Sequence, residues 1–382
     1  MTDLKDELTY RAYAAGWAVV RWLPERTAYG LFRLVADRTW RKRGKGVQRL
    51  ESNLARVLGP DATQEQIRTV SKQGMRNYMR YYCDTFRMET WSLERIDDTF
   101  SVENEHLLRD ALASGRGVVL ALPHMGNWDH AGAWAAVVSD GFTTVAERLK
   151  PEKLYERFLR YRESIGMEVL PLTGGAGTFA GLIRRLKSGG LVCLVAERDL
   201  TERGVPVEFF GETTKLPAGP AALAIATGAA FFPVTLWYGE GRQYAKIWPE
   251  LVPPAEGGKP EKTAQLCQRL ADAFAEGIAD HPADWHMLQR LWLVDLDPAR
   301  APKTGAPKTE AEAKAEAEAE PKAEAEPKAE AEPKAEAEPK AEAEPKVEPA
   351  PAPAPKPEPA SAPQPTSAPD PESAPSSPDG AR

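Results

Sequence analysis

Residues 117–130 read Gly117-Val-Val-Leu-Ala-Leu-Pro-His124-Met-Gly-Asn-Trp-Asp129-His130 and carry the clearest structural signal in the chain. The five apolar residues from Val118 to Leu122 predict a buried strand. Pro123 ends this strand, and apolar residues return at helical spacing from Trp128 onward. We therefore expect a strand, a small polar turn and a helix, with His124 just past the strand end.

Strand and helix signals alternate along most of the chain that follows. We expect strands at 143–146, 168–171, 191–196 and 231–237, and helices at 104–114, 128–138, 151–164, 178–188 and 217–228. A hairpin strand at 244–247 and a long helix at 260–279 close the series. Alternation at this spacing predicts an α/β fold with a mainly parallel central sheet flanked by helices.

The first sixty residues are basic, with 12 Lys or Arg against 6 Asp or Glu. Apolar and aromatic residues recur at helical spacing over 8–23 and 28–40, and a basic run follows at 41–45. One interpretation makes 1–60 an amphipathic region that associates with an anionic membrane surface. The other packs these helices on the domain and leaves the basic run as a solvated turn. Residues 61–90 read as another helical pair with a crowded aromatic face, which is typical of core packing.

The C-terminal segment differs from the rest in composition. From Ala301 onward there are 10 basic and 18 acidic residues and 19 of the 34 prolines, and Pro-Lys-Ala-Glu-Ala-Glu repeats four times over 321–344. Such a segment has few apolar residues to bury and too many prolines for a stable helix. We expect an α/β domain over 61–298, with 1–60 as part of it, and a disordered tail over 299–382.

Bulk features argue against several classes of protein. Residues 1–300 hold 39 basic and 38 acidic residues, so they lack the extended positive charge that nucleic-acid binding requires. Cys83, Cys193 and Cys267 are widely spaced, which favours a reducing compartment and argues against a structural zinc site. We also expect no signal peptide, because Met1 is followed by charged residues, and no apolar run approaches the ~20 residues that span a bilayer.

His124 and Asp129 are the first candidates for acid–base chemistry. On spacing alone their H-x4-D pattern is weak, because side chains five residues apart on a helix point about 140° away from each other. The pair works only if His124 sits in the turn, where Gly126 permits an unusual backbone conformation and Asn127 or Asp129 caps the helix. The alternative is a buried, hydrogen-bonded His124 and an Asp129 that merely favours the helix start.

Two further groups of charged residues accompany this turn. Glu197-Arg198-Asp199 follows the predicted strand 191–196, and ligands in open α/β sheets bind beyond the carboxyl ends of strands. The competing interpretation is a surface salt-bridge cluster. Arg148 and Arg162 lie in a second basic stretch that either binds phosphates or forms a solvated face.

Taken together, these segments resemble the bacterial lysophospholipid and lipid A acyltransferase superfamily, and within it the actinobacterial phosphatidylinositol mannoside acyltransferases. The likeness covers about residues 5–295. It rests on these ordered blocks: Pro123-His124-Met-Gly-Asn-Trp-Asp129, Ala146-Glu-Arg-Leu-Lys-Pro151 with Tyr161-Arg162-Glu-Ser, Ala196-Glu-Arg-Asp199, Phe209-Phe-Gly-Glu-Thr-Thr-Lys215-Leu-Pro-Ala-Gly-Pro220 and Phe232-Pro233-Val. The Glu-Arg-Asp block departs from the Glu-Gly-Thr/Ser-Arg of the glycerol-phosphate branch, which argues against a glycerolipid acceptor.

The resemblance implies transfer of a long fatty acyl group, for example palmitoyl, from acyl-CoA to a mannose hydroxyl of a mannosylated phosphatidylinositol. It implies His124 as general base without an acyl-enzyme, Glu197 as its acidic partner and Asp129 as a residue that shapes the turn. Arg162, Arg198 and Arg148, with Asn127 and Gly126, would bind CoA or the acceptor. We expect no cofactor and no metal, and a peripheral protein on the inner leaflet, at the cytoplasmic face of the plasma membrane.

Three alternatives remain open at this point. A related acyltransferase would act on a lipid A-type acceptor, another glycolipid or a lysophospholipid. A thioesterase would use water in place of the acceptor. A peripheral membrane scaffold would bind lipid through residues 1–60 and would not depend on His124.

Overall fold

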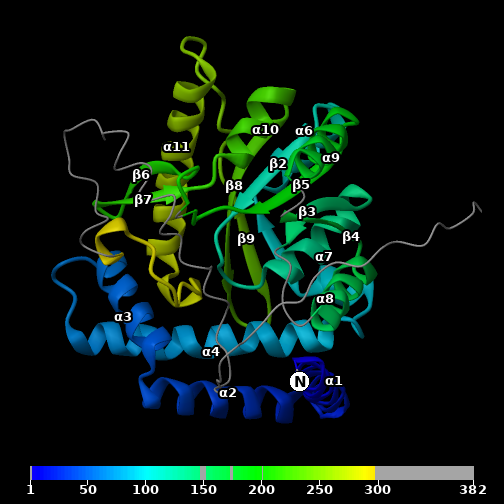
Figure 1. The fold of residues 1–382 in the computed structure, drawn as a ribbon, viewed down its shortest axis with the longest axis vertical. Helices are drawn as coiled ribbons and strands as arrows, with labels where there is room; N and C mark the ends of the chain where they lie inside the picture. The colour runs from blue at the N-terminus through cyan, green and yellow to red at the C-terminus, as the bar shows by residue number, and fades with distance from the viewer. Residues whose placement is uncertain (1, 147–151, 173–174, 200, 297–382) are drawn as a thin grey trace, which may run out of the picture. The chain divides into compact units, whose positions relative to one another are not determined.

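A mainly parallel sheet of seven strands forms the centre of the protein (Figure 1). The structure, a computed structural model, describes residues 2–146, 152–172, 175–199 and 201–296. The strands of the sheet are β1 (Phe100–Glu103), β2 (Val118–Leu122), β3 (Phe142–Ala146), β4 (Met167–Pro171), β5 (Leu191–Val195), β8 (Ala230–Tyr238) and β9 (Gln243–Ile247).

The strands are ordered β1-β9-β8-β2-β5-β3-β4. The five from β8 to β4 run parallel to one another, whereas β9 pairs antiparallel with β8 and carries β1 parallel to itself. Strands β2 and β5 are paired along their whole length, from Val118 opposite Leu191 to Leu122 opposite Val195. The segments that follow these two strands therefore leave the same edge of the sheet side by side. The predicted fold class is confirmed.

Helices cover both faces of the sheet, which explains why β2 is apolar at every position. Val119 and Ala121 face a core shared with α9 (Gly175–Lys187), α10 (Gly219–Thr227) and α11 (Lys259–Asp280). Val118, Leu120 and Leu122 face the opposite core, shared with α6 (Glu105–Ala113) and α7 (Trp128–Ser139). Burial of each large aliphatic side chain contributes about 1.5–3 kcal/mol, so this strand is a rigid base for the turn that follows it.

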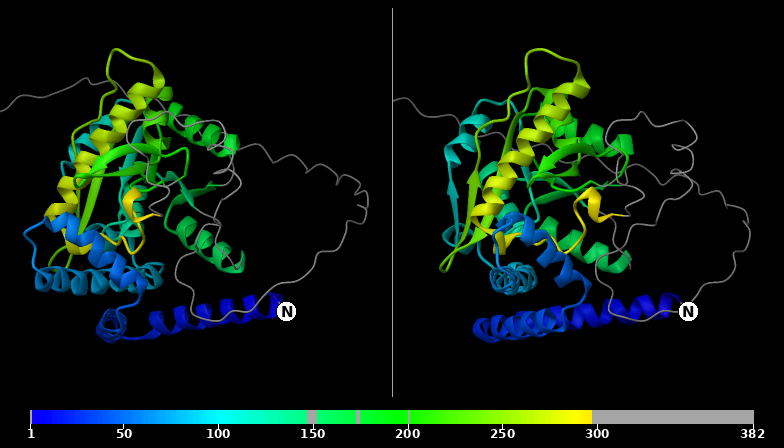
Figure 2. Two further views of the ribbon diagram at one scale, coloured as in Figure 1. Left: turned by 60° about the vertical axis from the view of Figure 1, so that its left-hand side comes forward. Right: turned by 90° about the vertical axis from the view of Figure 1, so that its left-hand side faces the viewer.

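The N-terminal helices lie beyond one end of the sheet. They are α1 (Thr2–Trp22), α2 (Glu25–Lys42), α3 (Lys45–Leu58) and α4 (Gln64–Met88). In both views of Figure 2, α4 lies between the sheet and the α1–α2 pair. Tyr81 of α4 stacks on Trp128 of α7 with ring centroids 4.0 Å apart, so α4 crosses the carboxyl end of β2.

Several elements differ from the sequence-based expectation. Residues 64–88 form one continuous helix and not a helical pair, and α3, α5 (Leu93–Asp98) and β1 were not predicted. A two-stranded antiparallel hairpin, β6 (Val205–Phe209) and β7 (Glu212–Leu216), was also missed. The other predicted strands and helices are present within a few residues, including α8 (Glu152–Ser164). The predicted tail at 299–382 lies outside the described residues.

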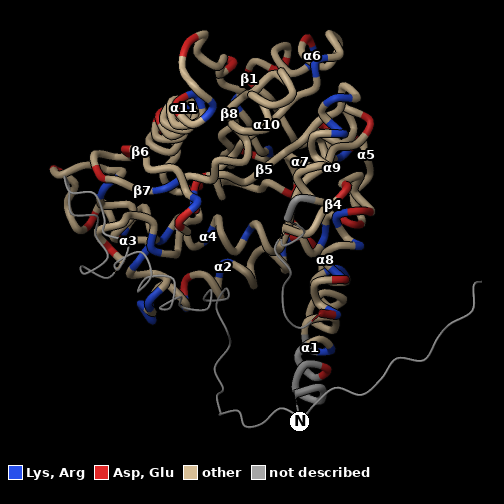
Figure 3. Tube along the Cα trace, turned by 45° about the horizontal axis from the view of Figure 1, so that its top comes forward, with Lys and Arg blue, Asp and Glu red and all other residues tan. Residues whose placement is uncertain are grey.

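Two observations bear on the charge and hydropathy of the described chain. In the view of Figure 3, basic and acidic residues are interspersed over the described chain. None of the helices of the described residues combines the length and the apolar content that a bilayer crossing requires.

Candidate active site

His124 and Glu197 meet where β2 and β5 end. His124 follows β2 by two residues, and Glu197 follows β5 by two residues. The ring Nδ1 of His124 lies 2.7 Å from Glu197 Oε1, and the His124 main-chain N–H donates to the same oxygen, also at 2.7 Å. The glutamate is buried, with a side chain 1% exposed, whereas the histidine side chain is 44% exposed. The pairing thus joins a buried anion to a ring that a substrate can reach.

The charge of Glu197 follows from its surroundings. Burial alone would raise the pKa of this carboxyl, but the His124 ring and main-chain N–H outweigh burial and hold the pKa below its usual range. An ionised carboxylate only accepts hydrogen bonds, so Nδ1 of His124 carries the proton in this contact. The lone pair of the neutral ring is then on Nε2, which is the arrangement a general base requires.

The backbone of the turn is held by residues 284–286. Met125 forms a bridge with Trp285, the His286 N–H donates to His124 O at 2.8 Å, and the Gly126 N–H donates to Asp284 O at 2.8 Å. The His286 ring adds a contact from Nε2 to Gly126 O at 2.9 Å. Trp285 is completely buried against aromatic rings of the β6–β7 hairpin. The hairpin therefore supports the turn through Trp285.

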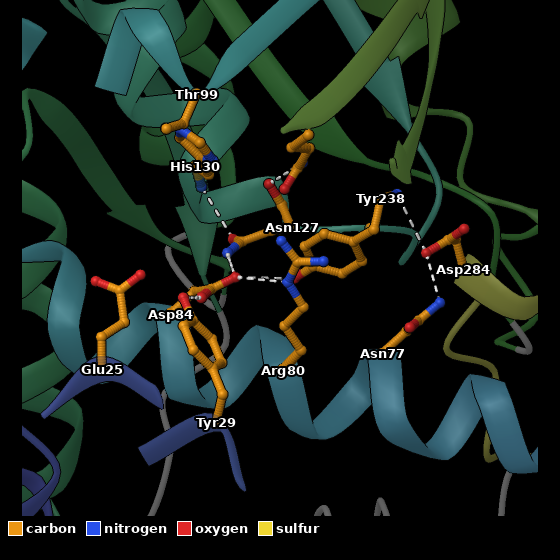
Figure 4. A network of polar contacts seen from close by, with 12 residues as sticks. Glu25, Tyr29, Asn77, Arg80, Asp84, Thr99, Asn127, His130, Tyr238 and Asp284 are labelled. Atoms are coloured by element: carbon orange, nitrogen blue, oxygen red, sulfur yellow. Dashed lines mark hydrogen bonds and ion pairs between the residues drawn. The ribbon is translucent and has the colours of Figure 1, made fainter. Parts of the chain in front are cut away.

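Asn127 caps the helix that follows the turn. Its side-chain oxygen accepts from the His130 N–H at 3.0 Å, which satisfies one free donor at the start of α7. The side-chain nitrogen Nδ2 of Asn127 lies 3.5 Å from Asp84 Oδ2, and its main-chain carbonyl oxygen accepts from Gln243 Nε2 at 2.7 Å. Figure 4 shows Asn127 between His130 and Asp84. Asn127, and not Asp129, is the capping residue.

Asp129 faces away from His124 into a separate buried cluster. Its Oδ1 is 3.1 Å from Arg162 Nε, and its Oδ2 accepts from the Tyr81 hydroxyl at 3.0 Å. Burial would lower the pKa of the Arg162 guanidinium, but the Asp129 charge outweighs burial and raises it. Both Asp129 oxygens are thus engaged by partners other than His124, and the carboxylate ties α7 to α4 and α8.

The remaining predicted residues have different positions. Gly126 adopts a left-handed conformation with φ of +57°. Arg198 is exposed beside Glu197, and its Nε donates to Arg290 O at 3.0 Å. Arg148 lies outside the described residues. No group of three or more His, Cys, Asp or Glu side chains suited to hold a metal occurs in the part of the chain that the structure describes.

The sequence interpretation missed Asp84, Gln243, Trp285 and His286. Only Asp84 left a signal, since it interrupts the aromatic face of a predicted core helix. It is buried, and burial raises the pKa of its carboxyl. The other three act on the turn from 116 to 162 residues away in sequence, and no local pattern reports such contacts.

The arrangement defines a class of protein, because an imidazole held by a buried carboxylate at a strand end is suited to activate a hydroxyl. A family model described as bacterial lipid A biosynthesis acyltransferase matches residues 4–294. The chain belongs to this acyltransferase family, and the resemblance seen in its sequence is confirmed.

Individual relatives carry a more specific name. A phosphatidylinositol mannoside acyltransferase of Mycolicibacterium smegmatis is 47% identical over 306 residues, which cover 79% of this chain and 97% of the relative. A protein of the same name from Mycobacterium tuberculosis (strain H37Rv) is 50% identical over 295 residues, which cover 76% of this chain and 90% of the relative.

Proposed function

We propose that the protein transfers a long-chain acyl group, palmitoyl in the first instance, from acyl-CoA to a mannose hydroxyl of a phosphatidylinositol mannoside. The observation that carries the proposal is the 2.7 Å contact between His124 Nδ1 and Glu197 Oε1 at the ends of two adjacent parallel strands. The name of the relatives supports the choice of acceptor.

In the proposed reaction the mannose hydroxyl oxygen attacks the thioester carbonyl while His124 Nε2 takes its proton. Glu197, ionised and buried, stabilises the imidazolium that forms. The tetrahedral intermediate then breaks its carbon–sulfur bond, and the imidazolium returns the proton to the departing CoA sulfur. The products are an ester and free CoA, and the histidine is again neutral.

The cysteines of the chain are poorly suited to carry an acyl group. Burial raises the pKa of the Cys83 and Cys267 thiols to about 12 and raises that of Cys193 as well. A thiol is nucleophilic only as thiolate. This supports direct transfer to the hydroxyl without an acyl-enzyme on cysteine.

Arg198 and Arg162 are proposed ligands of the CoA phosphates or the acceptor headgroup. Arg198 is exposed and directly follows Glu197. Arg162 Nε is already bonded to Asp129, so only its terminal amino groups would reach a phosphate.

We further propose that α1 and α2 bind the cytoplasmic face of the plasma membrane. Part of the predicted lipid face is internal, because Trp17 and Val20 are buried against the domain. Large apolar side chains are nevertheless exposed on both helices: Tyr13, Val19, Trp22, Leu31, Leu34 and Val35. Apolar side chains beside a basic flank favour an interfacial position.

The proposal is tested with purified full-length protein, palmitoyl-CoA and vesicles that contain a phosphatidylinositol dimannoside, with mass spectrometry of the lipid product. His124→Ala is expected to lose about 10³-fold in kcat, since general base catalysis contributes about 10²–10⁴-fold. Glu197→Gln keeps an acceptor for both N–H groups but loses the charge, so a loss of at least about 10²-fold is expected with little change in KM.

Exposed residues of the same types provide matched controls. His106→Ala and Glu256→Gln are expected to retain full activity, because both side chains lie on the surface, away from the turn. Wild-type activity in His124→Ala would refute the general-base role. A lipid A-type or lysophospholipid acceptor used in preference, or fatty acid released without a lipid product, would refute the choice of acceptor.

A further inference from the structure

A cavity of about 500 Å³ lies between α2 and α4 and is lined in part by Asp84 and Gln243, which contact Asn127. We call it the α2–α4 cavity. Its walls come from α2, α4, α7, the segment 91–99 and the turn between β8 and β9. Its size falls within the ~300–1,000 Å³ typical of small-molecule sites. Figure 4 shows side chains of this wall, among them Tyr29, Arg80, Asp84 and His130.

Arginine dominates the charge of the cavity. Five arginines line it, namely Arg33, Arg76, Arg80, Arg95 and Arg242, against two carboxylates, Glu25 and Asp84. Glu25 pairs with Arg95 at 2.9 Å, and Asp84 lies 3.8 Å from Arg80. Arg76 is paired with Asp37. This leaves an excess of two positive charges, carried by Arg33 and Arg242 at the exposed rim.

Arg33 and Arg242 are available to an anion. The contact described for Arg242 is a hydrogen bond to the neutral Ser101 hydroxyl at 3.1 Å. Arg33 forms no salt bridge among the described residues, although its charge acts on Asp37, which is itself bridged to Arg76. Guanidinium groups bind phosphate through two parallel N–H donors. The rim is therefore suited to a phosphate ester.

The floor of the cavity offers hydrogen-bond acceptors. Gln243 is 2% exposed, its Nε2 is used on Asn127 O, and its Oε1 has no hydrogen-bond partner among the described residues. A buried amide oxygen left unpaired is costly unless a ligand donates to it. The carboxylate of Asp84 is already engaged by Tyr29, Asn127 and Tyr238, and that of Glu25 is paired with Arg95. Arginines at the rim and a buried amide oxygen below match a ligand that carries a phosphate and hydroxyl groups.

The cavity adjoins the apolar surface of α2. One face of this helix, with Glu25, Tyr29 and Arg33 at four-residue spacing, lines the cavity. Its outer face exposes Leu34 (60%) and Leu31 (43%). A helix that shows apolar side chains outward and cavity residues inward is placed to hold a lipid headgroup while its outer face meets the acyl region.

We propose that the α2–α4 cavity binds a phosphorylated polyol, as a lipid headgroup or as the free phosphate ester, at a site separate from the His124–Glu197 pair. His124 does not line the cavity, and the buried Asn127 contacts its wall residues Asp84 and Gln243. The choice of inositol as the test polyol rests on the proposed acceptor of the acyl-transfer reaction. The proposal that the cavity binds a phosphorylated polyol does not depend on that acceptor. Gln243 and His130 belong both to the cavity wall and to the contacts that hold Asn127, so an occupant touches residues that position the turn.

The test is calorimetric titration of the full-length protein with glycerophosphoinositol, inorganic phosphate and myo-inositol. Glycerophosphoinositol is expected to bind at one site, at least 10-fold more tightly than either fragment. The double variant R33E/R242E is expected to weaken this binding at least 10-fold. The control R26E/R38E has the same charge change at exposed positions of α2 outside the cavity, and its affinity should stay within twofold of wild type.

Other outcomes decide the remaining questions. Absence of saturable binding, equal losses in both double variants, or phosphate binding as tightly as the ester would overturn the proposal. His124→Ala should bind glycerophosphoinositol as wild type does, which separates this site from the acyl-transfer proposal. Competition by glycerophosphoinositol against phosphatidylinositol vesicles, but not against phosphatidylglycerol vesicles, would identify the lipid headgroup as the source; binding without such competition would identify the free ester.

Discussion

At the scale of single residues, Gly126 is where the backbone of the turn admits no side chain. Its φ is +57°, and a Cβ would lie 2.8 Å from Cβ of Leu236. We expect Gly126→Ala to lower the free energy of unfolding by about 1–3 kcal/mol and to displace the His124 backbone. Urea denaturation checks the stability, and the acyl-transfer assay checks the geometry. Gly30→Ala in α2, where a Cβ meets nothing within 4 Å, should be neutral or slightly stabilising; equal losses in both variants would contradict the argument.

His130 gives a prediction for the dependence of stability on pH. Burial lowers the pKa of this ring to about 4. Below its ordinary pKa near 6.5 the unfolded chain binds a proton that the folded chain does not. Its contribution is therefore complete above about pH 6.5 and is lost as the pH falls from 6.5 toward 4. We expect the free energy of unfolding to drop by about 1–3 kcal/mol over this interval on account of His130.

Urea unfolding at pH 7 and pH 4.5 measures this effect in wild type and in His130→Gln. The variant should lose less stability on acidification than wild type, because the titrating group is gone. His106→Gln, which changes an exposed histidine, should behave as wild type. An identical pH dependence in all three proteins would show that His130 does not titrate in this way.

At the scale of elements, α1 divides its aromatic residues between the domain and the surface. Trp17 is 1% exposed and contacts the rings of Phe86, Phe158 and Tyr161, whereas Trp22 is 85% exposed. We expect Trp17→Ala to cost about 3–5 kcal/mol and to speed amide hydrogen exchange in α1. Trp22→Ala should leave stability unchanged and weaken binding to anionic vesicles. If neither variant binds anionic vesicles more weakly than wild type does, the proposed role of α1 is contradicted.

The predictability of each element depended on what stabilises it. The buried strands β2, β5 and β8 are apolar runs, so the sequence alone predicted them. The β6–β7 hairpin contains Glu208, Thr213 and Lys215 at its outward positions, and it owes its position to contacts of Phe209 with Trp285 and Trp292. The local sequence therefore gives little indication of this hairpin, because its stabilising contacts are with residues far away in the chain. Helix α4 continues through Gly74, which lies beside Leu50 and the main chain at Ala283.

At the scale of the whole molecule, chain topology brings the site together. Glu197 was a candidate because it follows a predicted strand, and the family resemblance implied that it is the partner of His124. Parallel pairing of β2 with β5 brings it to His124. Asp129 was the nearer carboxylate in sequence, but its side chain contacts Tyr81 of α4 and Arg162 of α8. Adjacency in a sheet thus decided which acid meets the histidine. Residues 284–286 hold the backbone of the His124 turn because the chain runs back to this turn after α11. No sequence motif predicts that path.

The last prediction concerns the C-terminal segment. The interactions described above lie within residues 2–296, and positive and negative charges balance almost completely over 1–300. Deletion of 299–382 removes the acidic excess but few apolar residues. We expect the truncated protein to keep the thermal unfolding midpoint and the kcat of the full chain, because the composition of the segment offers few large apolar residues to bury. Its affinity for anionic vesicles should rise, since eleven basic and eighteen acidic residues leave with the segment. Differential scanning calorimetry and vesicle sedimentation at low and high salt measure both effects.

A midpoint lowered by more than a few degrees would show that the segment packs on the domain, and unchanged vesicle affinity at low salt would show that its charge does not act at the membrane.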